Sequence, residues 1–96
     1  MGGTKEDFHR DMIGIYKAVR SELGYNAARF IQMVTQYGGF EAARRLIASD
    51  SISYGFEFLW ENDRLDLSME ALVLRPEYSE LFTLTEREIC SERLGR

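Results

Sequence analysis

Residues 55–74 read GFEFLWENDRLDLSMEALVL, and this stretch decides the fold. Phe56, Leu59 and Trp60 recur at the three- and four-residue spacing of an amphipathic helix, and the Asn-Asp pair that follows predicts the end of that helix. Ser68 then stands where an N-cap residue is expected before a second helix, MEALVLR. The stretch therefore predicts two helices joined by a short connector that holds two inward-facing leucines, packed as one corner.

Helical periodicity extends through the rest of the chain. The apolar positions at helical spacing are Phe8, Met12, Ile15, Tyr16, Val19 and Leu23, then Ala27, Phe30, Ile31 and Val34, then Phe40, Ala43, Leu46 and Ile47, with Ile52 before the opening stretch. The expected capping or boundary residues are Thr4, Gly24, Asn26, Gly38-Gly39, Asp50, Ser51, Ser53, Pro76, and Thr85 with Glu88 as a capping box. The chain has no convincing strand alternation. We therefore expect an all-α fold, a compact single-domain bundle of six to seven short helices over residues 1–96, with residues 1–4 flexible.

Charge divides the chain into two unequal halves. Residues 1–48 hold seven basic and five acidic side chains, whereas residues 49–96 hold five basic and eleven acidic ones. The net charge of the chain is −4. An acidic second half argues against a general nucleic-acid-binding protein, because such binding rests on neutralising phosphates. It is compatible with a basic protein partner.

The residues that most enzymes and metal sites need are scarce. His9 is the only histidine and Cys90 the only cysteine, and neither belongs to a catalytic or zinc-binding motif. The glycines form no phosphate-binding loop, so we expect no cofactor, no metal and no catalytic residue. A single cysteine, no apolar run of membrane-spanning length and no signal sequence together predict a cytoplasmic protein that does not enter membranes.

The charges of the opening stretch have two interpretations. In the first, Glu57, Glu61 and Arg64 meet on one side of a helix, and Arg64 also reaches Asp66 or Glu70, which makes an ion-pair network that ties two helices together. In the second, they form a recognition surface for a protein partner around Trp and Arg, the residue types that dominate binding hot spots. The candidate interaction surface comprises Glu57, Trp60, Glu61, Arg64, Asp66 and Glu70. A Trp60 ring that is largely exposed beside Arg64 would favour the second interpretation.

Two other surfaces suggest alternative functions. Arg29, Arg44 and Arg45 make a small basic footprint for weak nucleic-acid binding, partly offset by a neighbouring acid. The carboxylates of the second half suit a mimic of the phosphate backbone that inhibits a nuclease or a CRISPR-type effector; they include Glu77, Glu80, Glu86, Glu88 and Glu92. Three aromatic residues fall outside the apolar stripes and are candidates for a homodimer face: Tyr54, Phe58 and Tyr78.

Four blocks of the sequence resemble, in order, a widespread bacterial family of uncharacterised small all-α domains. The blocks are ELGYNAARFIQMV, GGFEAARRLIAS, GFEFLWENDRLDLSMEALVL and RPEYSELFTLTEREICSERL, and they match the pattern ELGYxAxRF, GGxxAA, GFxxLWExxRLDL[ST]xE and LFxxE. The resemblance covers about residues 8–94 and includes most of the candidate surface, with Cys90 where the family has Ala. Members stand alone or are attached to larger proteins, some of which are similar to nucleases or restriction-type enzymes. The resemblance thus implies an accessory domain in bacterial nucleic-acid defence or processing, and phage defence or anti-defence is the expected setting.

From these observations we expect a non-catalytic protein-interaction module. Its partner would be a nuclease or another defence-system protein, and its acidic half would steer a basic surface towards it. The two alternatives that stay open are the acidic mimic and the weak nucleic-acid-binding domain.

Overall fold

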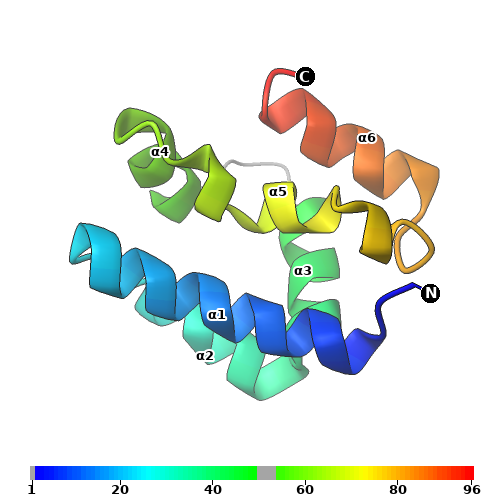
Figure 1. Ribbon diagram of the computed structural model, residues 1–96, viewed down its shortest axis with the longest axis horizontal. Helices are drawn as coiled ribbons and strands as arrows, with labels where there is room; N and C mark the ends of the chain where they lie inside the picture. The colour runs from blue at the N-terminus through cyan, green and yellow to red at the C-terminus, as the bar shows by residue number, and fades with distance from the viewer. Residues whose placement is uncertain (1, 50–53) are drawn as a thin grey trace.

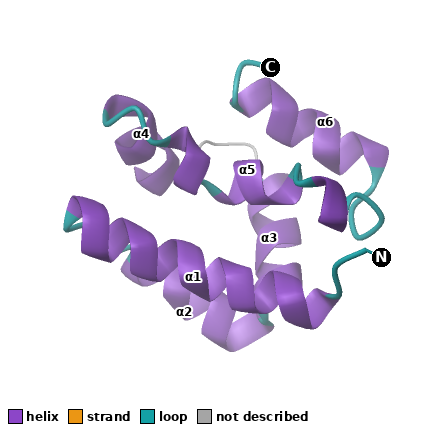
Figure 2. Ribbon diagram, in the orientation of Figure 1, coloured by secondary structure: helices purple, strands orange, loops and turns teal. Residues whose placement is uncertain are grey.

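Helices account for nearly all of the regular structure in the computed structural model, which describes residues 2–49 and 54–96 (Figures 1 and 2). The α-helices are α1 (Lys5–Leu23), α2 (Ala28–Tyr37), α3 (Gly39–Ala48), α4 (Tyr54–Glu61), α5 (Met69–Val73) and α6 (Leu84–Arg93). Two 3₁₀ turns, η1 (Leu65–Leu67) and η2 (Pro76–Tyr78), lie beside α5. The described ranges contain no strand, which confirms the all-α prediction.

Helix α1 begins and ends where the sequence predicts. The Thr4 hydroxyl accepts from the Asp7 backbone N–H at 3.1 Å, and the Asp7 carboxylate accepts from the Thr4 N–H, which completes a capping box. Gly24 ends the helix in the left-handed region at φ 66°, where a side chain would be strained. Gly3, which we expected to be flexible, donates its N–H to the Glu77 carbonyl.

The prediction that Asn26 caps α2 is wrong. The N-cap is Ala27, whose side chain offers no oxygen, and Asn26 Oδ1 instead accepts from the Tyr16 hydroxyl at 2.7 Å. A tertiary partner on α1 has therefore taken the oxygen that a local cap would use. The start of α2 has no side-chain cap as a result.

Helices α2 and α3 meet at Gly38, which ends the first and precedes the second. Gly39 is already inside α3, and its N–H donates to Nδ1 of His9 at 2.8 Å. A Cβ atom at Gly39 would lie 2.6 Å from the Cα of His9. Glycine at this position therefore lets α3 pack directly on α1.

The corner formed by residues 55–74 is a Schellman turn followed by η1 and α5. Asp63 has φ 56°, the Arg64 N–H donates to the Leu59 carbonyl at 2.8 Å, and the Asp63 N–H donates to the Trp60 carbonyl at 3.1 Å. Ser68 accepts from the Ala71 N–H at 3.1 Å and so caps α5, as predicted. The predicted caps Asp50, Ser51 and Ser53 and the apolar Ile52 lie outside the described residues.

Helix α6 begins two residues earlier than expected. The capping box consists of Thr83 and Glu86, not Thr85 and Glu88: the Thr83 hydroxyl accepts from the Glu86 N–H at 3.1 Å. The sequence TLTEREI contains both boxes in overlapping registers. In the register that the chain adopts, the Glu86 carboxylate also accepts a hydrogen bond from Arg44 on α3 at 2.9 Å.

The core lies where α1 and α3 meet α5, η2 and α6. Helix α3 crosses the middle of the molecule and contacts α1, α2 and α6, while α1 also contacts α5 (Figure 1). Twelve buried side chains make up the main cluster: Phe8, Met12, Val34, Ala42, Ala43, Ile47, Met69, Leu72, Val73, Tyr78, Phe82 and Cys90. No helix in the described part of the chain is both long and apolar enough to cross a membrane.

Tyr78 belongs to this core and not to a dimer face, so that part of the homodimer prediction is wrong. Its ring packs edge-on against Phe8 with centroids 5.1 Å apart, and its hydroxyl donates to the Asp11 carboxylate. Phe58 is half-buried and stacks on Tyr25 at 4.4 Å. The Tyr54 side chain lies outside the described part of the structure.

Candidate protein-interaction surface

Trp60 is largely exposed, with 66% of its surface open to solvent. The sequence pattern predicted that Trp60 lies on the inward stripe of α4 together with Phe56 and Leu59. Of these three residues, only Phe56 and Leu59 are buried. The prediction for Trp60 is wrong because α4 lies at the edge of the bundle. Its contact with the core is narrow, and no described element covers the side on which Trp60 lies.

Two carboxylates share this side of α4 with Trp60, and a third follows directly after the helix. Glu57 and Trp60 are three residues apart and Glu57 and Glu61 four, so the three side chains share one helix face. Glu57, Glu61 and Asp63 are exposed, and none of them forms an ion pair with another described residue. We name Glu57, Trp60, Glu61 and Asp63 the Trp60 surface. Sequence analysis missed Asp63 because the residue was assigned only the role of ending α4.

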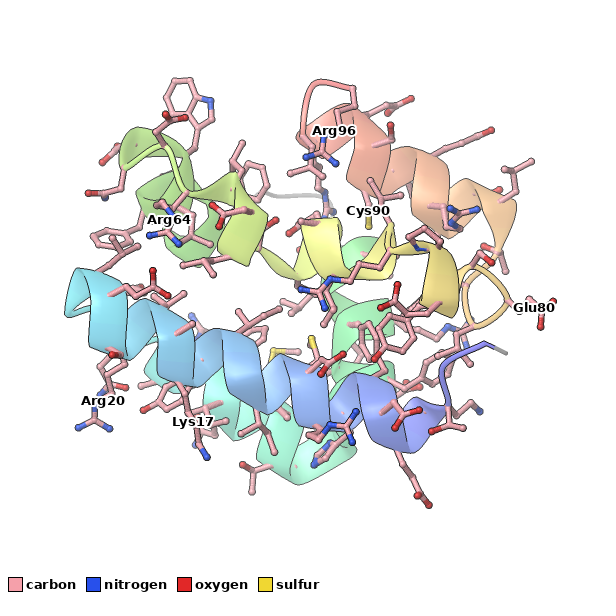
Figure 3. All side chains as sticks on the ribbon, viewed as in Figure 1. Lys17, Arg20, Arg64, Glu80, Cys90 and Arg96 are labelled. Atoms are coloured by element: carbon pink, nitrogen blue, oxygen red, sulfur yellow. The ribbon has the colours of Figure 1, made fainter. Side chains whose placement is uncertain are left out.

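Arg64 points away from this surface and ties the corner to α1 (Figure 3). Its guanidinium lies 2.9 Å from a Glu22 carboxylate oxygen and 3.1 Å from one of Asp66. The Arg64 hydrogen bond lowers the pKa of Asp66 below its ordinary value. The expected network is therefore real in part: Arg64 pairs with Asp66 and joins two helices, but its other partner is Glu22 and not Glu61 or Glu70.

Glu70 is buried and cannot contribute to a docking surface. Its carboxylate lies 3.1 Å from Nη1 of Arg93, and the two side chains are 8% and 13% exposed. The Arg93 guanidinium also donates to the backbone carbonyls of Leu46, Ile47 and Ser49, the last carbonyls of α3 and its C-cap. This clamp joins α3, α5 and α6. No sequence signal pointed to it, because Glu70 and Arg93 are 23 residues apart and each looks like an exposed helix residue.

The three arginines proposed for nucleic-acid contact do not present three unopposed charges. Nε of Arg44 lies 2.9 Å from the Glu86 carboxylate, and this hydrogen bond raises the pKa of Arg44. Arg45 lies 3.4 Å from Glu41, the predicted pair, and 4.0 Å over the ring of Tyr37. Arg29 alone is exposed without a carboxylate partner in the described ranges. The arrangement leaves little positive charge for a phosphate backbone.

The acidic residues proposed as a phosphate mimic also divide into exposed side chains and one that is held within the structure. Glu77, Glu80, Glu88 and Glu92 are exposed. Burial alone would raise the pKa of Glu86, but hydrogen bonds from the Thr83 N–H and from Arg44 lower it below its ordinary value. Glu86 therefore serves the structure of α6, and only the other four are presented to solvent.

No constellation for nucleophilic catalysis is found among the described residues. His9 Nδ1 accepts from the Gly39 N–H, and Cys90 is fully buried on α6. Burial, with a smaller effect of Glu70, raises the pKa of the Cys90 thiol to about 12, so the nucleophilic thiolate is scarce at neutral pH. No group of three or more potential metal-ligating side chains comes together in the part of the chain that the structure covers.

Comparison of the chain with models of protein families, with curated proteins and with solved structures found no match. The family resemblance stated above therefore stays a prediction, and the surface itself has to support any functional argument.

Proposed function

We propose that the protein is a non-catalytic interaction module that docks on a partner protein through the Trp60 surface. The single observation behind this proposal is the 66% exposure of Trp60, the chain's only tryptophan, beside three carboxylates without ionic partners among the described residues. Exposing a large aromatic side chain to water is unfavourable, and burying it against a partner recovers that free energy.

The composition of the surface indicates what it would bind. Tryptophan is enriched among the few residues that supply most of the binding energy of an interface, and such residues insert into pockets of the partner. Glu57, Glu61 and Asp63 around it would form a charged rim that attracts a basic surface and speeds encounter at low salt. The expected partner is therefore a protein with an apolar pocket bordered by Lys and Arg.

The resemblance described above suggests the biological setting. It favours a nuclease or another defence-system protein as the partner, in a bacterial cytoplasm. Nucleases present basic surfaces because they bind phosphates, so an acidic docking surface is compatible with this choice.

Affinity capture from the native host at low salt tests the proposal. The tagged protein should retain a partner in stoichiometric amount, and Trp60→Ala should release it. Leu84→Ala is the matched control, because Leu84 is 71% exposed on a different helix. Circular dichroism should show that both variants keep the fold. Equal capture by the wild type and Trp60→Ala, or no stoichiometric partner at all, would contradict the proposal.

One observation keeps the acidic mimic as a second candidate. Glu88 and Glu92 are four residues apart on α6, and both are exposed together with Glu77 and Glu80. These exposed carboxylates could occupy the nucleic-acid groove of an effector. This candidate predicts competition with nucleic acid for the effector and loss of inhibition on charge reversal within residues 77–92, with no dependence on Trp60.

A further inference from the structure

A cavity of about 570 Å³ lies between α1, α2 and the corner of α4 and η1, on the inner side of α4 and therefore opposite Trp60. Its walls are mainly apolar; the principal side chains are Ile15, Val19, Phe30, Met33, Leu59 and Met69. Small-molecule sites have this volume range and this composition, with a few polar groups placed at one end. Neither the Trp60 surface nor the packing among residues 2–49 and 54–96 uses this space.

The polar end of the cavity is the start of α2. Ala27, Ala28 and Arg29 line it, and Arg29 is exposed there without a carboxylate partner in the described ranges. Because Ala27 gives α2 no side-chain cap, the backbone N–H groups of Arg29 and Phe30 have no acceptor among the described residues. These groups and the positive end of the helix dipole add to the Arg29 charge.

The other charges at the cavity cancel. Arg93 and Glu70 both line it, but they are held against each other at 3.1 Å. Arg29 is thus the one charged side chain among the described lining residues that is not neutralised, in a chain whose net charge is −4. A positive mouth on an apolar cavity complements a ligand with a negative head and an apolar body.

We propose that this cavity binds an amphipathic carboxylate, a small molecule with an aliphatic chain and an anionic head. The chain lies among the apolar walls, and the carboxylate accepts hydrogen bonds from the Arg29 guanidinium and from the free N–H groups at the start of α2. Asn26 adds a further donor, because its Oδ1 is occupied by Tyr16 and its amide nitrogen has no described acceptor.

Calorimetric titration with dodecanoate, kept below its micelle concentration, tests the proposal on the whole chain. Arg29→Glu should weaken binding by about tenfold or more, because it replaces a charge-assisted hydrogen bond with a repulsion. Lys17→Glu is the matched control: Lys17 is also exposed, makes no described ion pair and points away from α4 and α5 (Figure 3). Its affinity should stay within about twofold of the wild type. Dodecanol, which lacks the charge, should bind about tenfold more weakly than dodecanoate or worse.

Methionine methyl resonances show where the ligand binds. Met33 and Met69 line the cavity, whereas Met12 is fully buried and does not line it. Dodecanoate should shift the first two and leave Met12 unchanged. Absence of binding, equal binding of dodecanol, equal weakening by both charge reversals, or shifts that do not involve Met33 and Met69 would each overturn the proposal. None of these results bears on docking through Trp60, because no protein partner is present in the assay.

Discussion

Replacing Arg93 by Ala should destabilise the fold more than replacing any other arginine. The substitution removes the only described basic partner of the buried Glu70 carboxylate and also removes the guanidinium hydrogen bonds to three carbonyls at the end of α3. Because both members of the pair are nearly inaccessible to water, solvent cannot take over these contacts. The loss therefore includes the desolvation penalty of the carboxylate left behind.

The expected magnitude follows from that burial. Breaking a buried ion pair from one side costs roughly 3–5 kcal/mol, out of a total stability of roughly 5–15 kcal/mol for a domain of ordinary stability. For a chain of this size the melting temperature should fall by at least about 12 °C. Arg75→Ala is the control, because its guanidinium is half exposed and lies 3.9 Å from its carboxylate partner, Asp11. An exposed pair of this kind contributes roughly 0–1 kcal/mol.

Urea unfolding followed by circular dichroism measures these free energies. The double variant Glu70→Ala with Arg93→Ala should cost less than the sum of the two single variants by at least about 1 kcal/mol, because the second substitution removes a charge already left unpaired. If Arg93→Ala costs less than about 1 kcal/mol, or if the two substitutions are additive, the clamp does not hold the three helices together.

Three further predictions concern local features. Thr83→Ala should lower the free energy of unfolding by about 1 kcal/mol in urea, and Thr85→Ala by much less, because only Thr83 caps α6. A larger effect of Thr85→Ala would mean that the helix begins at the later capping box, Thr85 with Glu88. Gly39→Ala should be destabilising because its Cβ meets the α1 backbone, whereas Gly14→Ala, with open space around it, should stabilise by about 0.5–1 kcal/mol; thermal melts distinguish them. Cys90, whose thiol pKa burial raises to about 12, should resist iodoacetamide at pH 8 in the folded chain and react once urea unfolds it; rapid alkylation of folded protein would contradict its burial.

Local sequence signals predicted the helices well where the deciding contacts are themselves local. Thr4, Gly24 and Ser68 act through hydrogen bonds or dihedral angles within a few residues, and all three behave as expected. Asn26 failed as a cap because a tyrosine ten residues earlier binds its oxygen. Where two registers of one capping motif overlap, as in TLTEREI, packing against another helix makes the choice.

The candidate surface was predicted only in part, because burial depends on contacts between elements that are distant in the sequence. Helical spacing says that Phe56, Leu59 and Trp60 lie near one another on α4, but the width of the buried stripe depends on which elements cover the helix. Glu70 resembles a solvent-exposed acid in the first turn of a helix, and its burial follows from a partner on α6. Ion pairs within a few residues, such as Arg64 with Asp66, were predictable, whereas those between distant helices were not.

The fluorescence of the single tryptophan tests the central claim most directly. In the isolated chain Trp60 should emit like a largely hydrated indole and be readily quenched by acrylamide, because it is 66% exposed. Adding the partner captured from the host should shift the emission to shorter wavelength and protect the ring from quenching. A protected, blue-shifted Trp60 in the isolated chain, or an emission that does not change when the partner binds, would contradict docking through this surface.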